Sequence, residues 1–222
     1  MITRRPMLVF EPEGIRLPSN LTSLARFRRW AMSDAFPERG RIDWMAGEVR
    51  IDLSPEDLDT HGSPKTALAA DLGSLLEARD RGVVYVGRAR LTDLAAGLST
   101  EPDVTVVLFD SVEAGRVRIV RRVEIQGAAD LVVECVSDSS EEKDATILPP
   151  LYHAAGVREY WLVDARPRDL RFTLFRRMAR RYRAVEPDDR GFRRSEVLGV
   201  SARLVRLAPR EGLVRYRLET RP

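Results

Sequence analysis

Residues 131–136, with the sequence LVVECV, constrain the fold more than any other part of the chain. They are apolar and prone to form a β-strand except at Glu134, and such a run is typical of a strand covered on both faces of its sheet. A carboxylate placed there costs several kcal/mol unless a cation or hydrogen-bond donors meet it. Two partners are open for Glu134: an arginine, or a divalent metal shared with a second carboxylate, which the rest of the sequence favours.

The composition is that of a globular α/β protein. The chain has 222 residues, of which 44% are hydrophobic and 32% are charged, and its longest apolar runs have the length of strands. No segment of the sequence is long enough to cross a bilayer, and residues 1–10 lack the apolar stretch of a secretion signal. Cys135 is the single cysteine, which excludes an internal disulfide and cysteine-based zinc sites. We therefore expect a cytoplasmic protein without a membrane partner, in which residues 1–222 form a single domain.

The C-terminal part is strongly basic. Residues 165–222 hold 17 arginines against seven acidic residues, a net charge of +10, whereas residues 1–164 carry a net charge of −7. This part could bind a polyanion such as nucleic acid, or it could form the solvated outer face of a sheet, and both interpretations are open.

Only Lys65 and Lys143 are lysines among the 37 basic residues. Lysine can share or lose a proton whereas arginine cannot, and Lys143 follows Glu134 by nine residues.

Strands and helices alternate along the first three quarters of the chain. Residues 1–20 are expected to form an extended lead-in, and residues 165–222 a β-rich C-terminal part. A capping-box pattern from Ser139 to Glu142 predicts a helix after the central strand, which Pro149-Pro150 interrupts. The other expected elements are a helix over residues 21–35, a hairpin over 42–53, a helix over 64–79 capped by Ser63, an irregular segment over 89–100, and strands at 83–86, 104–108, 159–164, 170–175, 181–185, 197–207 and 213–218.

Three residues remain for chemistry after common motifs are excluded. The sequence contains no phosphate-binding loop, dinucleotide fingerprint or nucleophile elbow, and its two histidines lack the spacing of zinc ligands. Asp103 stands at the start of one strand, Glu134 lies in another, and Lys143 follows the second. Two carboxylates suit Mg²⁺, which polarises a phosphoryl oxygen, and a nearby lysine can orient or deprotonate a water or stabilise developing charge. The combination suits hydrolysis of phosphodiester bonds.

Three segments carry a family resemblance: Glu101-Pro102-Asp103, residues 129–137 and residues 151–164. They resemble the Uma2 family of restriction-endonuclease-like proteins in the PD-(D/E)xK nuclease superfamily, and the similarity covers roughly residues 22–200. The resemblance implies a restriction-endonuclease-like α/β core with a mixed central β-sheet flanked by helices, to which the C-terminal part adds antiparallel β extensions. It also implies that Asp103, Glu134 and the main-chain carbonyl of Cys135 bind the metal.

One position departs from the superfamily pattern. Lysine is expected two residues after the glutamate, where this chain has Val136, so Lys143 is the candidate for that role. The resemblance also draws attention to Glu48 and His61, which either lie beside the metal site or are a surface charge on a hairpin and a cap at the start of a helix.

These observations predict a Mg²⁺- or Mn²⁺-dependent endonuclease, a hydrolase, with Asp103, Glu134 and Lys143 as catalytic residues. Its partner is then nucleic acid, for which we expect DNA, and a homodimer is expected because cutting both strands of a duplex favours two-fold symmetry. The alternative is a non-catalytic nucleic-acid-binding or assembly module that retains the nuclease fold. A third possibility is a structural homo-oligomer in which Glu134 pairs with arginine.

Overall fold

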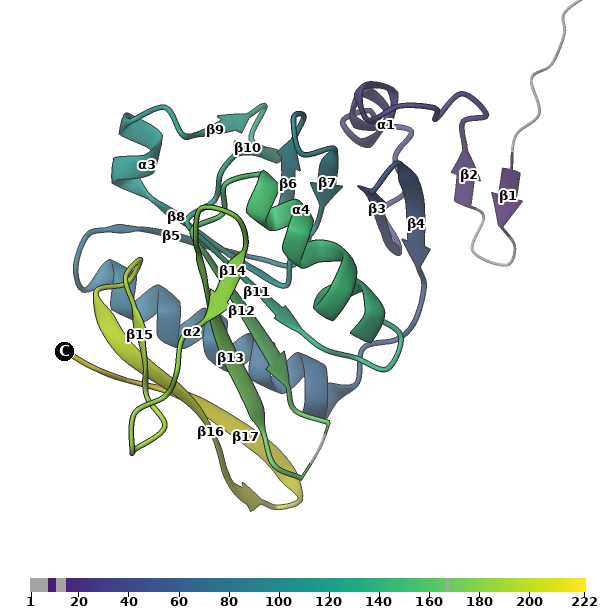
Figure 1. The fold of residues 1–222 in the computed structure, drawn as a ribbon. Coiled ribbons are helices and arrows are strands. Elements are labelled where there is room, and N and C mark those ends of the chain that lie inside the picture. The colour runs from purple at the N-terminus through teal and green to yellow at the C-terminus, as the bar shows by residue number, and fades with distance from the viewer. Residues whose placement is uncertain (1–7, 11–14, 167) are drawn as a thin grey trace, which may run out of the picture.

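The structure is a computed structural model, and it describes residues 8–10, 15–166 and 168–222. It is a mixed α/β structure with two six-stranded sheets flanked by helices (Figure 1). The helices are α1 (Leu24–Ala31), the π-helical turn η1 (Leu58–Gly62), α2 (Ser63–Glu77), α3 (Phe109–Glu113), the π-helical turn η2 (Lys143–Ile147) and α4 (Leu148–Ala154). The strands are β1 (Leu8–Phe10), β2 (Ile15–Leu17), β3 (Arg41–Met45), β4 (Glu48–Asp52), β5 (Gly82–Val86), β6 (Arg90–Asp93), β7 (Leu98–Thr100), β8 (Val104–Leu108), β9 (Val117–Val120), β10 (Glu124–Gly127), β11 (Leu131–Cys135), β12 (Glu159–Asp164), β13 (Arg171–Arg177), β14 (Tyr182–Ala184), β15 (Arg193–Ser195), β16 (Val200–Arg210) and β17 (Leu213–Arg221).

The central sheet is mixed, as expected, and has the strand order β14-β13-β12-β11-β8-β5. Strands β11 and β12 are parallel, while β8 runs antiparallel to β11. Helix α4 covers one face of this sheet and α2 covers the other (Figure 1). Because side chains alternate along a strand, Val133 packs on the α2 side while Val132 and Glu134 face α4.

The second sheet has the strand order β4-β3-β7-β6-β10-β9. The predicted hairpin over residues 42–53 is confirmed by β3 and β4, and its turn places Ala46 at φ 52° and Gly47 at φ 85°. These positive angles are those of a tight two-residue hairpin turn. Residues 89–100, expected to be irregular, instead form the short antiparallel pair β6 and β7. Each strand has only three or four residues, which is too short for the alternating pattern to be recognised.

Helix α1 lies within the predicted range and begins after Ser23, whose side chain accepts a hydrogen bond from the amide of Arg26. It buries Leu24, Phe27 and Trp30 against the second sheet. The expected extended lead-in falls partly on residues 1–7 and 11–14, which lie outside the described residues. The described part of the lead-in forms the antiparallel pair β1 and β2.

The start of α2 differs from the prediction. Ser63 does not cap the helix, because its hydroxyl donates to the carbonyl of Val214 at 2.9 Å. The π-helical turn η1 precedes α2 instead, and Asp57 caps that turn by accepting from the amides of Asp59 and Thr60. This wide turn places His61 at the end of the central sheet, where its imidazole is buried.

The helix after β11 also differs in detail. No capping bond from Ser139 is found among the described residues, and Ser140 instead accepts a hydrogen bond from the amide of Ser137 at 2.9 Å. The prediction that Pro149-Pro150 interrupt this helix is wrong, because the π-helical turn η2 leads directly into α4, whose first turn contains both prolines. Prolines are tolerated there because the first amides of a helix need no partner within it.

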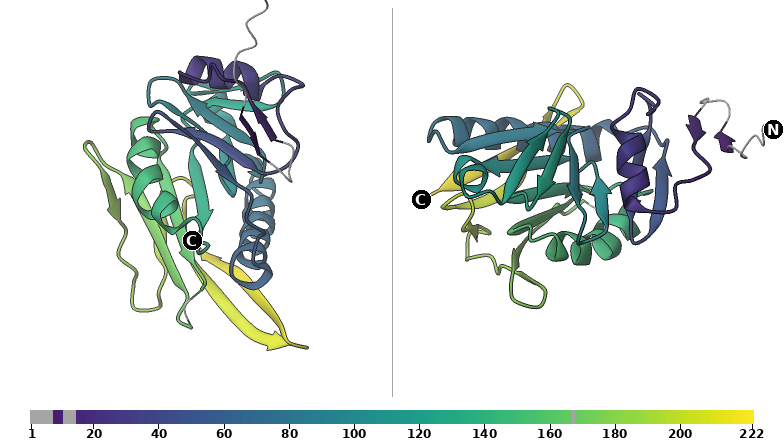
Figure 2. Two further views of the ribbon diagram at one scale, coloured as in Figure 1. Left: turned by 90° about the vertical axis from the view of Figure 1, so that its right-hand side faces the viewer. Right: turned by 90° about the horizontal axis from the view of Figure 1, so that it is seen from above.

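The C-terminal strands form a three-stranded antiparallel sheet in the order β15-β16-β17. The long β16–β17 hairpin packs on α2, where the amide of Leu218 donates to Asp71 at 2.8 Å, and it extends past the end of that helix (Figure 2). Tyr216 and Leu218 join the core on the α2 side of the central sheet. Among the described helices, none combines the length and the apolar character that a membrane crossing requires.

Glu159, at the start of β12, attaches the β15 segment to the central sheet. Its buried carboxylate accepts hydrogen bonds from the hydroxyl of Ser195 at 2.7 Å, the amides of Glu196 and Val197, and the indole of Trp161.

Replacing Glu159 by alanine leaves several buried donors unpaired, so the free energy of unfolding should fall by about 3 kcal/mol in urea denaturation. The matched control is Glu196→Ala, which removes a largely exposed carboxylate and should change stability by less than about 1 kcal/mol. Equal losses in both variants would contradict this role of Glu159.

Candidate metal centre

Asp103 and Glu134 lie on the same face of the central sheet. Strands β8 and β11 are antiparallel with Val104 opposite Val133, so the next pair of positions in this register brings Asp103 opposite Glu134. Alternation directs both side chains to the face that α4 covers, and both are fully buried. The two side chains therefore point to the same face of the sheet, as a shared ion would require.

Both carboxylate oxygens of Asp103 have partners. Oδ1 accepts a hydrogen bond from Nη2 of Arg41 at 2.7 Å, and Oδ2 accepts one from the amide of Cys135 at 2.8 Å. Nε2 of His61 lies 3.2 Å from Oδ2. Burial alone would raise the pKa of Asp103, but the hydrogen bond from His61 and the charge of Arg41 outweigh it and hold the pKa well below its usual range. Asp103 is therefore ionised.

The surroundings of Glu134 are poorer in donors. Tyr152 donates to Oε1 at 2.5 Å, whereas Oε2 lies 3.8 Å from Nζ of Lys143 and receives no hydrogen bond from the part of the chain that the structure describes. Burial raises the pKa of Glu134 to about 8; Lys143 opposes the rise, while Asp144 and Asp103 add to it. A further cation beside Oε2 would favour the ionised form.

Lys143 reaches the site from η2. Its ammonium lies 2.9 Å from Oδ1 of Asp144, and only 11% of its side chain is exposed. Burial alone would lower the pKa of Lys143, but Glu134 and Asp144 outweigh it and raise the pKa above its usual value. Tyr160 donates to the carbonyl of Asp144 at 2.7 Å and thereby fixes η2 on the sheet. Lys143 therefore places a positive charge beside Glu134.

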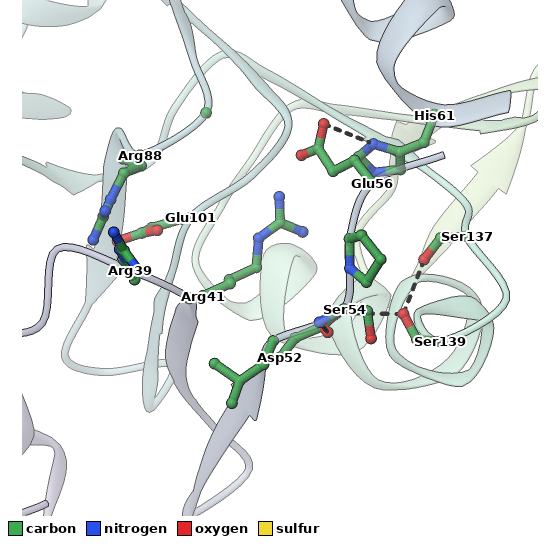
Figure 3. Close-up of a pocket in the computed structure, with 14 residues that line it drawn as sticks. Arg39, Arg41, Asp52, Ser54, Glu56, His61, Arg88, Glu101, Ser137 and Ser139 are labelled. Carbon is green, nitrogen blue, oxygen red and sulfur yellow. Dashed lines mark hydrogen bonds and ion pairs between the residues drawn. The ribbon is translucent and has the colours of Figure 1, made fainter. Parts of the chain in front are cut away.

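His61 links Asp103 to Glu56. Its Nδ1 lies 3.5 Å from Oε2 of Glu56 (Figure 3), whereas its Nε2 is the nitrogen that faces Asp103. Ligand atoms of Glu56, His61 and Asp103 all lie within 4.8 Å of one another, a spacing that one metal ion can bridge. Carboxylate oxygens and an imidazole nitrogen are ordinary ligands for a divalent metal. Glu56 also holds Lys65 at 2.5 Å, which anchors its position.

We call Asp103, Glu134 and the charged residues around them (Arg41, Glu56, His61, Lys143 and Asp144) the cluster. The structure does not bring every candidate residue to this cluster. Glu48 lies on the exposed β3–β4 hairpin, where its carboxylate is 3.5 Å from Arg50, and no described contact joins it to Asp103 or Glu134. Cys135 contributes its main chain, since its side chain packs in the core on the α2 side. Burial raises the pKa of its thiol well above the usual value, which does not suit a nucleophile.

Three residues of the cluster were not identified from the sequence: Arg41, Glu56 and Asp144. Asp144 directly follows Lys143, and this adjacency was the available signal. Arg41 and Glu56 carry no local pattern, because their contacts depend on how distant segments meet.

A buried network holds the segment before β8 against β3. Arg90 donates to Glu101 at 2.5 Å, and the amide of Glu101 donates to Asp43 at 3.1 Å. All three side chains are buried, and burial raises the pKa of both Glu101 and Asp43. Asp43 lies two residues from Arg41, and Glu101 lies two residues from Asp103. The network therefore helps to set the distance between Arg41 and Asp103.

A cavity of about 410 Å³ opens beside the cluster. Its lining includes Glu56 and His61 together with the guanidinium groups of Arg39, Arg41 and Arg88 (Figure 3). The cavity therefore gives access from solvent to the cluster, past three positive charges.

Comparison with known proteins confirms the family resemblance that the sequence shows. The model of the Uma2 family, described as "Putative restriction endonuclease", matches residues 24–206. A crystal structure of "a putative nuclease belonging to DUF820" from Anabaena variabilis is similar, with a TM-score of 0.54 and 16% sequence identity over 71% of this chain and 83% of that chain. At this identity the likeness shows the fold alone. No curated protein matches the chain.

The cation of Lys143 should stabilise the folded chain. Replacing Lys143 by methionine leaves the buried carboxylates of Asp144 and Glu134 without their nearest cation, so the free energy of unfolding should fall by about 3 kcal/mol. Asp144→Asn in the same chain should restore at least about 1 kcal/mol because it removes one of the stranded charges. A double-mutant cycle in urea measures both values.

Lys65→Met provides the control, since Lys65 pairs with the half-exposed Glu56 and should cost less than about 1 kcal/mol. Strictly additive effects of Lys143→Met and Asp144→Asn would contradict the coupling.

Proposed function

Because the chain belongs to the Uma2 family, we propose that it is a metal-dependent endonuclease that hydrolyses phosphodiester bonds of nucleic acid on a restriction-endonuclease-like core. One observation carries the proposal: Asp103 and Glu134 lie opposite each other on one sheet face, with Lys143 3.8 Å from Glu134. In this proposal Asp103, Glu134 and Lys143 are the catalytic residues, and Asp103, Glu134 and the main-chain carbonyl of Cys135 bind Mg²⁺ or Mn²⁺.

The residues present fit such an ion. Oε2 of Glu134 is buried without a hydrogen-bond donor among the described residues, which is a costly state that a cation would relieve. Glu56, His61 and Asp103 also place ligand atoms within 4.8 Å of one another, which is a second arrangement of oxygen and nitrogen ligands that includes Asp103 but not Glu134. When bound, the ion polarises a phosphoryl oxygen and lowers the pKa of a bound water.

Lys143 takes the role of the lysine expected at Val136 in this proposal. Val136 is buried at the end of β11, and its amide donates to Val163 at 2.8 Å. The ammonium of Lys143 instead approaches the same face from η2, where Asp144 holds it. Because it is positively charged, it would stabilise negative charge that develops on the phosphoryl group.

The proposed partner is nucleic acid, for which we favour DNA. The basic residues 165–222, with a net charge of +10, supply a surface for its phosphates. We also propose that residues 1–222 act as one domain, which is supported by the packing of β17 on α2. The homodimer remains a prediction that rests on the two-fold symmetry of a duplex.

A second candidate function is nucleic-acid binding without cleavage. Two features favour this candidate: Val136 stands where lysine is expected, and the C-terminal part is basic. It differs from the first candidate in one measurable respect, because binding would then need no ion at Asp103 and Glu134.

Substitution of the two carboxylates separates these candidates. Glu134→Gln and Asp103→Asn should each lower Mg²⁺- or Mn²⁺-dependent cleavage of supercoiled plasmid by at least about 100-fold, since loss of mere outer-shell partners of a metal already costs 10–100-fold. Glu48→Gln, on the exposed hairpin, should cleave like the unmodified chain. Circular dichroism checks that each variant folds. Cleavage that continues in Glu134→Gln or in excess chelator would remove the mechanism.

The basic C-terminal part should contact phosphates. The affinity for a DNA duplex should fall linearly on a plot of log affinity against log salt, and Arg217→Gln or Arg210→Gln on the exposed hairpin should each reduce the slope by about 1. Fluorescence anisotropy at several salt concentrations measures the slope. Binding that is insensitive to salt would contradict a role for this surface.

A further inference from the structure

Arg41 connects the two six-stranded sheets at the candidate metal centre. It is the first residue of β3, and its Nη2 lies 2.7 Å from Oδ1 of Asp103, just ahead of β8. About 19% of its side chain is exposed. Burial alone would lower the pKa of Arg41, but the charges of Asp103, Glu134 and Asp43 outweigh it and raise the pKa. Arg41 is therefore a permanent cation within the field of both proposed metal ligands.

This contact conflicts with metal binding by Asp103. Oδ2 of Asp103 already accepts from the amide of Cys135 and faces His61, so Oδ1 is the oxygen that a second cation would have to share with Arg41. A guanidinium and a divalent ion on one carboxylate repel each other strongly at low dielectric. Binding of the ion should therefore weaken or break the contact between Arg41 and Asp103.

The cavity offers a place for the released guanidinium. In Figure 3 the end of the Arg41 side chain points into the space between Glu101 on one side and Glu56 with His61 on the other. Both acidic groups already have cations, because Glu101 pairs with Arg90 and Glu56 with Lys65. They therefore do not need Arg41.

Two further arginines surround the same cavity. Arg39 and Arg88 are exposed on its lining, and within the described ranges neither forms an ion pair; Arg88 donates to the carbonyl of Pro37. Ser137 and Ser139 add hydroxyl groups to the lining. The carboxylates of Asp52, Glu56 and Glu101 also line the cavity, but Glu56 and Glu101 have cations of their own, and Asp52 accepts from the amide of Ser54 and the hydroxyl of Ser139. The three guanidinium groups are therefore the part of the lining that suits an anion.

We propose that Arg41 is a phosphate-binding residue that Asp103 holds in place until a divalent metal binds. The ion takes over the charge of Asp103, and the guanidinium then binds a phosphate of the nucleic-acid backbone in the cavity, beside Arg39 and Arg88. This inference rests on the proposed function, and it adds a residue that links metal binding to substrate binding.

Arginine suits both the metal-free state, in which it pairs with Asp103, and the metal-bound state, in which it binds a phosphate. Its charge does not depend on pH in the physiological range, so it offsets the buried Asp103 at all times, and its planar fork can form two parallel hydrogen bonds to a phosphate. Since linkage is reciprocal, phosphate binding by Arg41 should in turn favour metal binding. A merely structural ion pair would show no such linkage.

Metal affinity tests the first half of the proposal. Electron paramagnetic resonance of Mn²⁺ with the full chain should show that Arg41→Met binds the ion at least about 5-fold more tightly, because the competing cation has gone. Arg41→Lys keeps a competing charge and should bind Mn²⁺ like the unmodified chain. Arg50→Met, a change in the neighbouring strand of the same hairpin where Arg50 pairs with Glu48, should also leave the affinity unchanged.

Nucleic-acid affinity tests the second half. The anisotropy of a fluorescent DNA duplex is compared in saturating Ca²⁺, a hard cation for oxygen ligands, and in chelator. Arg41→Met and Arg41→Lys should weaken binding at least about 5-fold in Ca²⁺ and leave it unchanged in chelator, where Arg41 stays on Asp103. If Arg41→Met fails to fold by circular dichroism, Arg41→Lys still decides, because it loses the planar fork but keeps the charge.

The outcomes distinguish this inference from the proposed function. If the unmodified chain binds no Mn²⁺, or Asp103→Asn binds it equally well, the metal site itself is wrong. If Asp103→Asn loses Mn²⁺ while Arg41→Met binds it no more tightly, Arg41 does not compete with the ion. Weakening of DNA binding by the same factor in Ca²⁺ and in chelator would likewise overturn the proposal, since Arg41 would then act without any link to metal.

Discussion

The burial of two acidic side chains on the α4 face of the central sheet is the constraint on which the rest of the site depends. Asp103 and Glu134 are fully buried, and each ionised carboxylate in such surroundings requires compensation. The compensating groups come from three separate elements: Arg41 from β3, His61 from η1 and Lys143 from η2. The positions of these elements relative to the central sheet are therefore tied to the same two side chains.

The two carboxylates are not equivalent, and their surroundings explain why. Asp103 meets a guanidinium, an amide and an imidazole, which keep its pKa low. Glu134 meets one phenol and an ammonium at 3.8 Å, so burial dominates and raises its pKa. The side of the site around Glu134 is thus deficient in positive charge, whereas the side around Asp103 is already balanced by Arg41. An ion bound between them would correct the deficiency on one side and displace the arginine on the other.

Local patterns predicted the parts of this structure that local physics determines. The strand with Glu134, the hairpin over residues 42–53 and the helix after Pro64 follow from apolar runs and from the angles that glycine and proline allow. Lys143 could be selected because lysine is rare in this chain. Arg41 could not, since it is one of 35 arginines and meets Asp103 across 62 positions of sequence. Contacts of that kind depend on the packing of the two sheets.

The two π-helical turns were also beyond local patterns, and they help to explain how the site is built. Within the described residues, η1 carries His61 and η2 carries both Lys143 and Asp144. π-helical turns are rare, and they are found frequently at functional sites because their wider geometry redirects side chains. A chain that needed only to neutralise a buried glutamate could use a regular helix and one arginine. Two unusual turns that direct charged groups toward the same pair of carboxylates fit the proposed function, because departures from regular structure persist mainly where function requires them.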